Sequence, residues 1–324
     1  MSISHAILKT LSDGAFHSGE RLAAAHNVTR AAVWKAIKAL ERQFALEIHS
    51  VRGRGYRLAN PVDLLDTKHI AGLLQCADAI KGIEVFLSIE STNTYLMHAT
   101  GKQLPAPWVV LAEHQQAGRG RRGRNWYSPF AGNIYLSLSW RFVLAPANII
   151  GLSLALGVVI CRYLAQQGLT GLALKWPNDI LCQGKKICGL LVEMRGETSG
   201  PYDVVIGVGL NVAMPDSAHT AIDQPYISVQ DVLHRPLSRN HLAAGLIDAL
   251  VAALYDFEAR GFEQYLADWN RLDALRDRAV NILMADRQQA GIARGIDAQG
   301  ALLLEHDGRL QRYYSGEISL RAGV

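Results

Sequence analysis

The chain has 324 residues, of which 49% are hydrophobic and 19% are charged, with a formal net charge of +4. This length and composition are typical of a globular protein that buries a full core in two or three domains. The four cysteines form no CxxC pair, which argues against both a disulfide framework and a zinc site. We therefore expect reduced thiols, mostly in the core, at Cys76, Cys161, Cys182 and Cys188.

The positive charge is concentrated at the N-terminus. Residues 1–60 contain nine Lys or Arg and four Asp or Glu, which leaves 24 and 25 for the rest of the chain. Such an excess favours a polyanionic partner for this segment. Lys9 and Asp13 interrupt the only helix that could resemble a secretion signal, so we expect a cytoplasmic protein. The uncharged stretch 142–161 contains Pro146 and two glycines, which favours a buried helix over a membrane span.

The first 60 residues are patterned as three helices. Apolar residues recur at helical spacing from Ser2 to Leu11, and Gly14 then breaks the pattern. Ser18 and Thr29 are good N-cap residues for a second and a third helix. The pause at His26-Asn27 between them predicts two helices joined by a tight turn.

Basic residues lie on the third expected helix and in the hairpin that comes after it in the chain. Strands over 47–51 and 56–58 are expected around the basic turn Arg52-Gly53-Arg54-Gly55. Three helices followed by a basic hairpin predict a winged helix-turn-helix domain, with a solvated helical bundle as the alternative. Asn60-Pro61 closes the module, and we expect a linker after it. The residues expected at DNA are Ser18, Thr29, Arg30, Lys35, Lys38, Arg52 and Arg54.

The rest of the chain alternates strand-like and helical runs to about residue 270. This alternation predicts a mixed sheet covered by helices. The expected strands are 85–89, 108–113, 134–140, 172–176, 187–194 and 204–208. Short runs at 279–284, 289–296, 301–305 and 311–314 then predict a small antiparallel β-barrel.

A loop of four arginines and three glycines, Gly118–Trp126, directly follows one of these strands. Glycines let main-chain amides approach an anion, and guanidinium groups bind carboxylate or phosphate through paired donors. An RNA-binding Arg/Gly segment and a plain basic surface loop are the alternatives, but a single loop between strands favours an anionic ligand. The loop has neither the Gly-Lys-Ser/Thr ending nor the GxGxxG spacing of the common nucleotide-binding motifs.

Two further segments carry polar residues and glycines beside apolar strands. Lys175–Asp179 ends one strand, and Lys186 and Gly189 follow in the next. Gly207–Val212 places Asn211 at the end of a third. A glycine inside a strand permits close approach of a ligand or backbone, although a plain hairpin with exposed lysines also fits. Asn211 could read adenine or cap a turn.

Together these segments resemble the biotin–protein ligase family in residue type and order. They are Ser91-Thr92-Asn93, Gln115, Gly118–Trp126, Lys175–Asp179, Lys186 with Gly189, and Gly207–Asn211. The N-terminal domain and Glu317–Arg321 fit the bifunctional class II form of that family, which also represses transcription. The resemblance implies an α+β multidomain fold. Its parts are a winged helix-turn-helix domain (1–60), a class II synthetase-like mixed-sheet ligase domain (66–270) and an SH3-like β-barrel (271–324).

The resemblance also implies a role for each of these residues. Catalysis is expected from Arg119, Arg121, Lys186 and Asp179. Biotin is expected at Ser91, Thr92, Asn93, Gln115, Arg119, Gly120, Arg121, Lys186 and Gly189. ATP is expected at Arg121, Trp126, Lys175, Asn178, Asn211, Tyr226 and Arg321. Asn125 stands where a lysine is frequent and Tyr226 where a tryptophan can occur, and both departures bear on adenylate affinity.

The implied activity is ATP- and Mg²⁺-dependent transfer of biotin, through biotinoyl-AMP, to a lysine of a biotin carboxyl carrier protein. The implied partners are that carrier, operator DNA and a second copy of the chain, whose association biotinoyl-AMP favours. A lipoate-type ligase is an alternative that differs only in ligand choice. A transcription factor with an inactive effector domain is another, and the intact Arg119, Arg121 and Lys186 argue against it.

Overall fold

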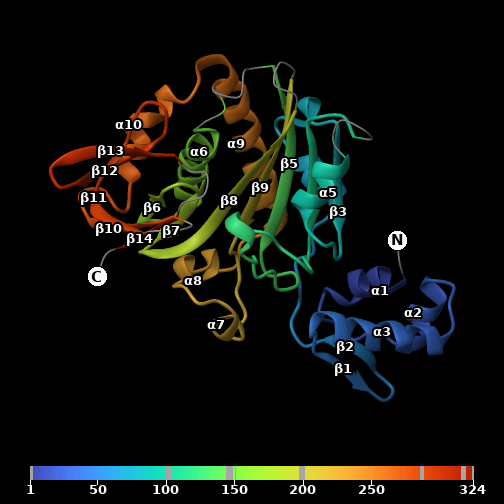
Figure 1. Ribbon diagram of the computed structural model, residues 1–324. Coiled ribbons are helices and arrows are strands. Elements are labelled where there is room, and N and C mark those ends of the chain that lie inside the picture. The colour runs from blue at the N-terminus through green and yellow to red at the C-terminus, as the bar shows by residue number, and fades with distance from the viewer. Residues whose placement is uncertain are drawn as a thin grey trace.

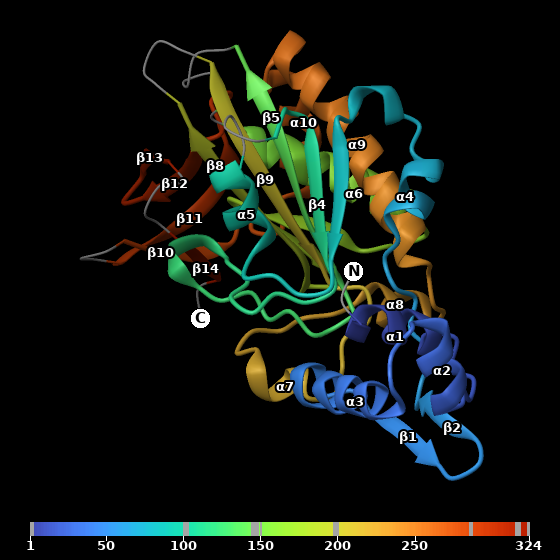
Figure 2. The same ribbon diagram turned by 90° about the vertical axis from the view of Figure 1, so that its right-hand side faces the viewer.

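The computed structural model describes residues 3–99, 104–143, 149, 151–196, 201–284, 288–314 and 319–322. Figures 1 and 2 show the N-terminal and C-terminal domains on opposite sides of a central domain. The central domain holds a seven-stranded mixed sheet, and the other two are smaller. This architecture confirms the predicted fold class.

The N-terminal domain is the predicted winged helix-turn-helix. Its elements are α1 (Ile3–Leu11), α2 (Gly19–Ala25), α3 (Arg30–Phe44), β1 (Ile48–Val51) and β2 (Gly55–Leu58). The Ser18 hydroxyl caps α2 by accepting from the Arg21 N–H at 3.1 Å, and the Thr29 hydroxyl caps α3 in the same way. The apolar stripes of the three helices meet in one buried cluster, so both predicted caps and the predicted core are confirmed.

The central sheet has the order β3-β4-β5-β9-β8-β7-β6, in which only β3 and β4 run parallel. Its strands are β3 (Gly82–Phe86), β4 (Trp108–Ala112), β5 (Ile134–Phe142), β6 (Leu172–Lys175), β7 (Asp179–Cys182), β8 (Lys185–Arg195) and β9 (Tyr202–Leu210). The helices are α4 (Thr67–Leu73), α5 (Thr92–Ala99), α6 (Leu152–Gln166), α7 (Ala218–Ala221), α8 (Val229–Leu233), α9 (Arg239–Arg260) and α10 (Glu263–Leu272), with single turns η1 (Ala77–Ala79) and η2 (Arg121–Gly123). Alternate strand residues bury against α6 and α9 on one face and α5 on the other.

The uncharged stretch 142–161 differs from the single buried helix that its composition suggested. Its first residue ends β5 at Phe142, and the helix α6 begins only at Leu152, after Gly151 at a positive φ of 93°. Residues 144–148 and 150 lie outside the described residues. The described helices include none that is long and apolar enough to cross a membrane.

The C-terminal domain is a five-stranded antiparallel sheet in the order β13-β12-β11-β10-β14. Its strands are β10 (Ala279–Leu283), β11 (Gln288–Ile296), β12 (Leu302–His306), β13 (Arg309–Tyr313) and β14 (Ser319–Ala322). The first four match the predicted runs within two residues at each end. The proposed boundary at 270 falls inside the last turn of α10, which ends at Leu272.

The segment predicted as a linker is anchored at several points. The Leu65 N–H donates to Glu113 Oε1 at 2.5 Å, and the Leu65 side chain is buried in the central core. Asp63 accepts from the Arg239 N–H at 2.7 Å, and Asp66 pairs with Lys9 of α1 at 2.7 Å. These contacts tie the N-terminal domain to the start of α9.

Aromatic packing adds a second contact between these two domains. The ring of Phe44, the last residue of α3, lies 4.3 Å from that of Phe130 and 5.6 Å from that of His114. Both partners lie in the connection between β4 and β5. The end of α3 therefore rests on the connection that carries Gln115.

The cysteines are unpaired, as predicted. Cys161, Cys182 and Cys188 are buried, and Cys76 is half-buried. Burial raises the pKa of both Cys76 and Cys161 to about 12. Their thiols are therefore protonated near neutral pH and poor nucleophiles.

Candidate active site and nucleic-acid interface

One cavity of about 810 Å³ opens between β8, β9, the glycine- and arginine-rich loop and the segment 221–226. The predicted ligand-site residues other than Arg321 all line it. They are Ser91, Thr92, Asn93, Gln115, Arg119, Gly120, Arg121, Trp126, Lys175, Asn178, Asp179, Lys186, Gly189, Asn211 and Tyr226. The Arg321 backbone pairs with Asn281 in the C-terminal sheet, and its side chain lies outside the described residues.

A network of hydroxyl and amide groups occupies one end of the cavity, at the start of α5. The Thr92 N–H and hydroxyl donate to Gln115 Oε1 at 2.9 and 3.2 Å. The Ser137 hydroxyl lies 2.6 Å from Asn93 Oδ1 and 2.7 Å from Thr92 Oγ1. Buried donors and acceptors at fixed positions suit a small polar ring such as a ureido group.

The indole of Trp126 lies against two glycines that face each other on neighbouring strands. Gly189 of β8 and Gly209 of β9 are register partners, and a Cβ atom at Gly209 would lie 2.5 Å from the indole. The indole Nε1 is buried and has no hydrogen-bond partner. The close approach expected at Gly189 is therefore made by Trp126, which holds a buried donor available to a ligand.

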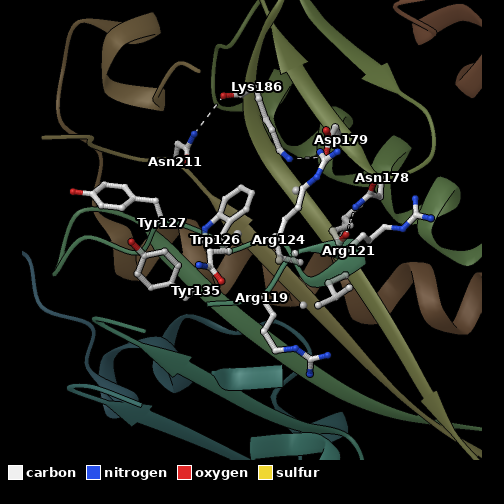
Figure 3. Close-up of a pocket in the computed structure, with 18 of the residues that line it drawn as sticks. Arg119, Arg121, Arg124, Trp126, Tyr127, Tyr135, Asn178, Asp179, Lys186 and Asn211 are labelled. Carbon is white, nitrogen blue, oxygen red and sulfur yellow. Dashed lines mark hydrogen bonds and ion pairs between the residues drawn. The ribbon is translucent and has the colours of Figure 1, made fainter. Parts of the chain in front are cut away.

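Positive charge meets one carboxylate in the middle of the cavity. Lys186 Nζ lies 2.7 Å from Asp179 Oδ1, with 16% and 19% of the two side chains exposed. Burial lowers the pKa of Arg121, and the nearby charge of Asp179 opposes that shift. Figure 3 shows the ion pair between Lys186 of β8 and Asp179 of the neighbouring strand β7. Lys186 and Arg121 are both partly desolvated, and the charge of a partly desolvated cation acts on an anion more strongly than that of a surface lysine.

Arg119 takes a different direction from this group, as Figure 3 shows. Its guanidinium pairs with Glu193 at 2.9 Å and donates to the Thr94 hydroxyl at 3.4 Å. Glu193 also accepts from Asn93 Nδ2 at 3.0 Å. Arg119 would have to move away from Glu193 to meet a carboxylate at Lys186.

Asn211 and Asn178 use their amide groups to hold main chain. Asn211 Nδ2 donates to the carbonyls of Lys186 and Ile227, both at 3.3 Å. Asn178 Nδ2 donates to the Leu190 carbonyl at 2.6 Å. Asn211 therefore holds the main chain on either side of the cavity edge, a role that the sequence did not suggest, and its contact with adenine stays a prediction. Tyr226 forms a bridge beside Lys186 at the cavity edge.

The cavity does not contain a ready-made metal cage. No cluster of three or more His, Cys, Asp or Glu side chains within metal-binding reach occurs among the residues that the structure describes. Asp179 is already paired with Lys186. Mg²⁺ held mainly by ATP phosphates and water, with few carboxylate ligands from the protein, agrees with this donor set.

Several site residues were missed from the sequence. Ser137 completes the Thr92–Asn93 network, Ser128 accepts from Gln115 Nε2 at 3.2 Å, and Glu193 holds Arg119. Ser137 and Ser139 interrupt the apolar run of the expected strand 134–140, and that signal was available. Ser128 and Glu193 had no distinguishing pattern around them.

The candidate DNA-binding residues divide by their contacts. Arg30 and Lys35 are exposed on α3, whereas Lys38 pairs with Glu41 at 2.7 Å. Arg52 is exposed at the tip of the hairpin. The guanidinium of Arg54 lies 4.2 Å from the centre of the Phe16 ring. Ser18 and Thr29 use their hydroxyls as helix caps, so direct DNA contact by these two side chains stays a prediction.

Three family models match consecutive parts of the chain. Residues 4–57 match a helix-turn-helix domain, 85–211 the biotin/lipoate A/B protein ligase family, and 277–321 the biotin protein ligase C-terminal domain. The chain is 43% identical to the bifunctional ligase/repressor BirA of Escherichia coli over 98% of this chain and 96% of that protein. The chain belongs to the bifunctional ligase/repressor family. The Bacillus subtilis member is 28% identical over 94% of both chains.

Other ligases match the ligase part of this family member. A biotin–[acetyl-CoA-carboxylase] ligase of Mycobacterium tuberculosis is 34% identical over 76% of this chain and 91% of that protein. The structure of a biotin protein ligase from Aquifex aeolicus in complex with biotin and ATP aligns with a TM-score of 0.64 at 23% identity. It covers 75% of this chain and 100% of that one. This likeness supports the fold of the ligase domain.

Proposed function

We propose that the protein joins biotin to a lysine of a biotin carboxyl carrier protein and represses the biotin synthesis genes. The carboxylate of biotin attacks the α-phosphorus of ATP, and pyrophosphate leaves to give biotinoyl-5′-AMP. The carrier lysine then attacks the biotinoyl carbonyl carbon, and AMP leaves. The observation that carries this proposal is one cavity that joins a polar ring-binding network to the Lys186–Asp179 pair.

The first step brings two anions together. The biotin carboxylate and the α-phosphate repel each other, and negative charge grows on the phosphate in the transition state. Lys186 and Arg121 line the same cavity and supply the compensating charge. The hydroxyl and amide network at the start of α5 would hold the ureido end and so fix the direction of the carboxylate.

The second step needs a neutral amine and protection from water. Asp179 would accept a proton from the incoming lysine ammonium, with Lys186 as its present partner. The glycine- and arginine-rich loop lines the cavity, and its closure over the mixed anhydride would exclude water. Arg119 would hold the biotin carboxylate once released from Glu193.

Repression would use the same intermediate. Biotinoyl-AMP would favour a homodimer, and two winged helix-turn-helix domains would then bind two operator half-sites. The carrier protein would compete for the monomer. Because operator DNA and the carrier protein are both inside the cell, we propose that the protein is cytoplasmic.

Release of pyrophosphate and label transfer test this function. The full chain is incubated with ATP, Mg²⁺ and a carrier domain, with either labelled biotin or labelled lipoate. We expect pyrophosphate release and label on the carrier with biotin alone. Preference for lipoate would identify a lipoate ligase, the other branch of the matched family. If neither pyrophosphate nor labelled carrier forms, DNA binding is the function that remains.

A further inference from the structure

Trp34 stands out among the six tryptophans, all of which lie in the described part of the chain. It exposes 51% of its surface, while the other five are half-buried or buried. Exposing an indole forfeits a large amount of apolar burial. This side chain was not among the residues that the sequence analysis assigned to DNA.

The position of Trp34 on α3 places it beside the cations. Arg30, Trp34 and Lys38 are spaced four residues apart and form one stripe along the helix. Val33 and Ile37 lie on the face that is buried against α1 and α2. The indole therefore shares its face with the positive charges and is turned away from the domain core.

We propose that Trp34 is a specificity-determining residue that contacts a thymine methyl group in the major groove of operator DNA. This inference rests on the proposed DNA-binding function. Residues near the N-terminus of a recognition helix reach base edges, and Trp34 is the fifth residue of α3. The thymine methyl is the apolar group that bases present in the major groove. Arg30 and Lys35 flank the indole and complement the phosphates on either side.

The chemistry of the two kinds of contact predicts different behaviour. A lysine that meets a phosphate strengthens binding to every duplex and increases its dependence on salt. An indole that meets a methyl group strengthens binding only where thymine stands at the right position. Trp34 and Lys35 are neighbours on one exposed face, so their variants form a matched pair.

The test uses a duplex selected by the full-length protein, with biotin and ATP present, from a random pool. Each thymine of that duplex is then replaced singly by uracil, which removes only the methyl group. We expect one uracil position in each half-site to weaken the native protein about fourfold, the value of one buried methyl group. Trp34→Ala should bind the selected duplex at least that much more weakly and show no further loss with that uracil.

Controls separate this effect from a general loss of binding. Trp34→Ala should bind a scrambled duplex as well as the native protein does, with an unchanged salt slope. Trp34→Phe should recover part of the specific affinity. Lys35→Ala should weaken both duplexes and reduce the salt slope by about two, because each subunit of the dimer loses about one phosphate contact. Unfolding midpoints of the variants establish that the domain is intact.

Two results would overturn the proposal while leaving DNA binding in place. One is that uracil at every thymine position weakens the binding of Trp34→Ala as much as it weakens the binding of the native protein. The other is an equal loss by Trp34→Ala on selected and scrambled duplexes, which would place the indole at the DNA backbone. Failure of the native protein to enrich or bind any duplex would instead overturn the proposed DNA-binding function together with this inference.

Discussion

Two ion pairs of nearly equal length have different surroundings in this molecule. Arg239 lies 2.8 Å from Glu113 with 4% and 3% of the two side chains exposed, and Lys186 lies 2.7 Å from Asp179 with 16% and 19% exposed. Arg239 also donates to the Asn133 carbonyl and to the Asp63 carbonyl, while Glu113 accepts from the Leu65 N–H. The first pair is enclosed by main-chain groups of the linker and of the segment before β5, and the second opens into the cavity.

We interpret the first pair as architectural and propose the second as functional. Burial raises the pKa of Glu113, and the charge of Arg239 opposes that rise, so each partner needs the other. Lys186 and Asp179 retain access to a ligand and can exchange partners. The following predictions test this contrast, from the largest expected effect to the smallest.

Removing the charge of the enclosed pair should destabilise the protein most. Arg239→Met leaves the Glu113 carboxylate buried and unpaired, and we expect a loss of about 3–5 kcal/mol in unfolding free energy. Arg141→Met is the matched control, because Arg141 pairs with Asp203 at 2.7 Å on the surface. We expect a change of at most about 1 kcal/mol there. Urea unfolding measures both, and equal losses would contradict the contrast.

Changing the open pair should affect chemistry more than stability. Asp179→Asn keeps the size of the side chain but removes the proposed proton acceptor. We expect transfer to the carrier lysine to fall by about 100-fold, the lower range for a general base. The rate of pyrophosphate release in the first turnover, measured in the same samples, should fall much less. A parallel loss of both steps would show that Asp179 mainly positions Lys186.

The aromatic contact between domains should have an intermediate effect on docking. Phe130→Ala removes the ring that packs on Phe44 at 4.3 Å. Aromatic pairs contribute about 0.5–1.5 kcal/mol beyond their burial, so we expect hydrogen exchange of residues 59–66 to accelerate about tenfold. Exchange in β8 serves as the internal reference. Unchanged exchange in the linker would mean that the polar anchors alone hold it.

Removing the exposed Lys9–Asp66 pair of the linker should have the smallest effect on stability, and that effect should be visible at acid pH. A hydrogen bond from Lys9 is the largest cause of the lowered pKa of Asp66. A lowered folded-state pKa adds stability above the unfolded value near pH 4 and loses it as pH falls through the folded value. Asp66→Asn keeps a helix cap but abolishes this dependence. Unfolding midpoints between pH 5 and pH 2 should therefore fall less steeply in the variant, and identical slopes would contradict the role of this pair.

The sequence was informative where local patterns decide structure. Helix caps at Ser18 and Thr29, the strand runs and the clustering of polar motifs each follow from neighbouring residues, and the structure agrees with them. The anchoring of Arg239 to Glu113 joins residues 126 positions apart, and no local pattern at either one indicates the other. The same limit explains why Glu193 was missed as the partner of Arg119.

Composition also failed where two elements share one apolar run. The stretch 142–161 supplies both the end of β5 and the start of α6, because buried strands and buried helices draw on the same residues. Likewise, the close approach at Gly189 was predicted, but its occupant was not. Trp126 packs against Gly189 although its loop is more than 60 residues away in the chain.

The most direct test of the central claim compares two adjacent lysines of β8. Lys185 is exposed, whereas Lys186 pairs with Asp179 in the cavity, so Lys185→Ala and Lys186→Ala remove the same charge from different places. Biotin- and ATP-dependent label transfer to the carrier lysine is measured for both. We predict a loss of about 100- to 1000-fold for Lys186→Ala and near-native transfer for Lys185→Ala. Equal transfer by the two variants would contradict the assignment of this cavity as the site of adenylation.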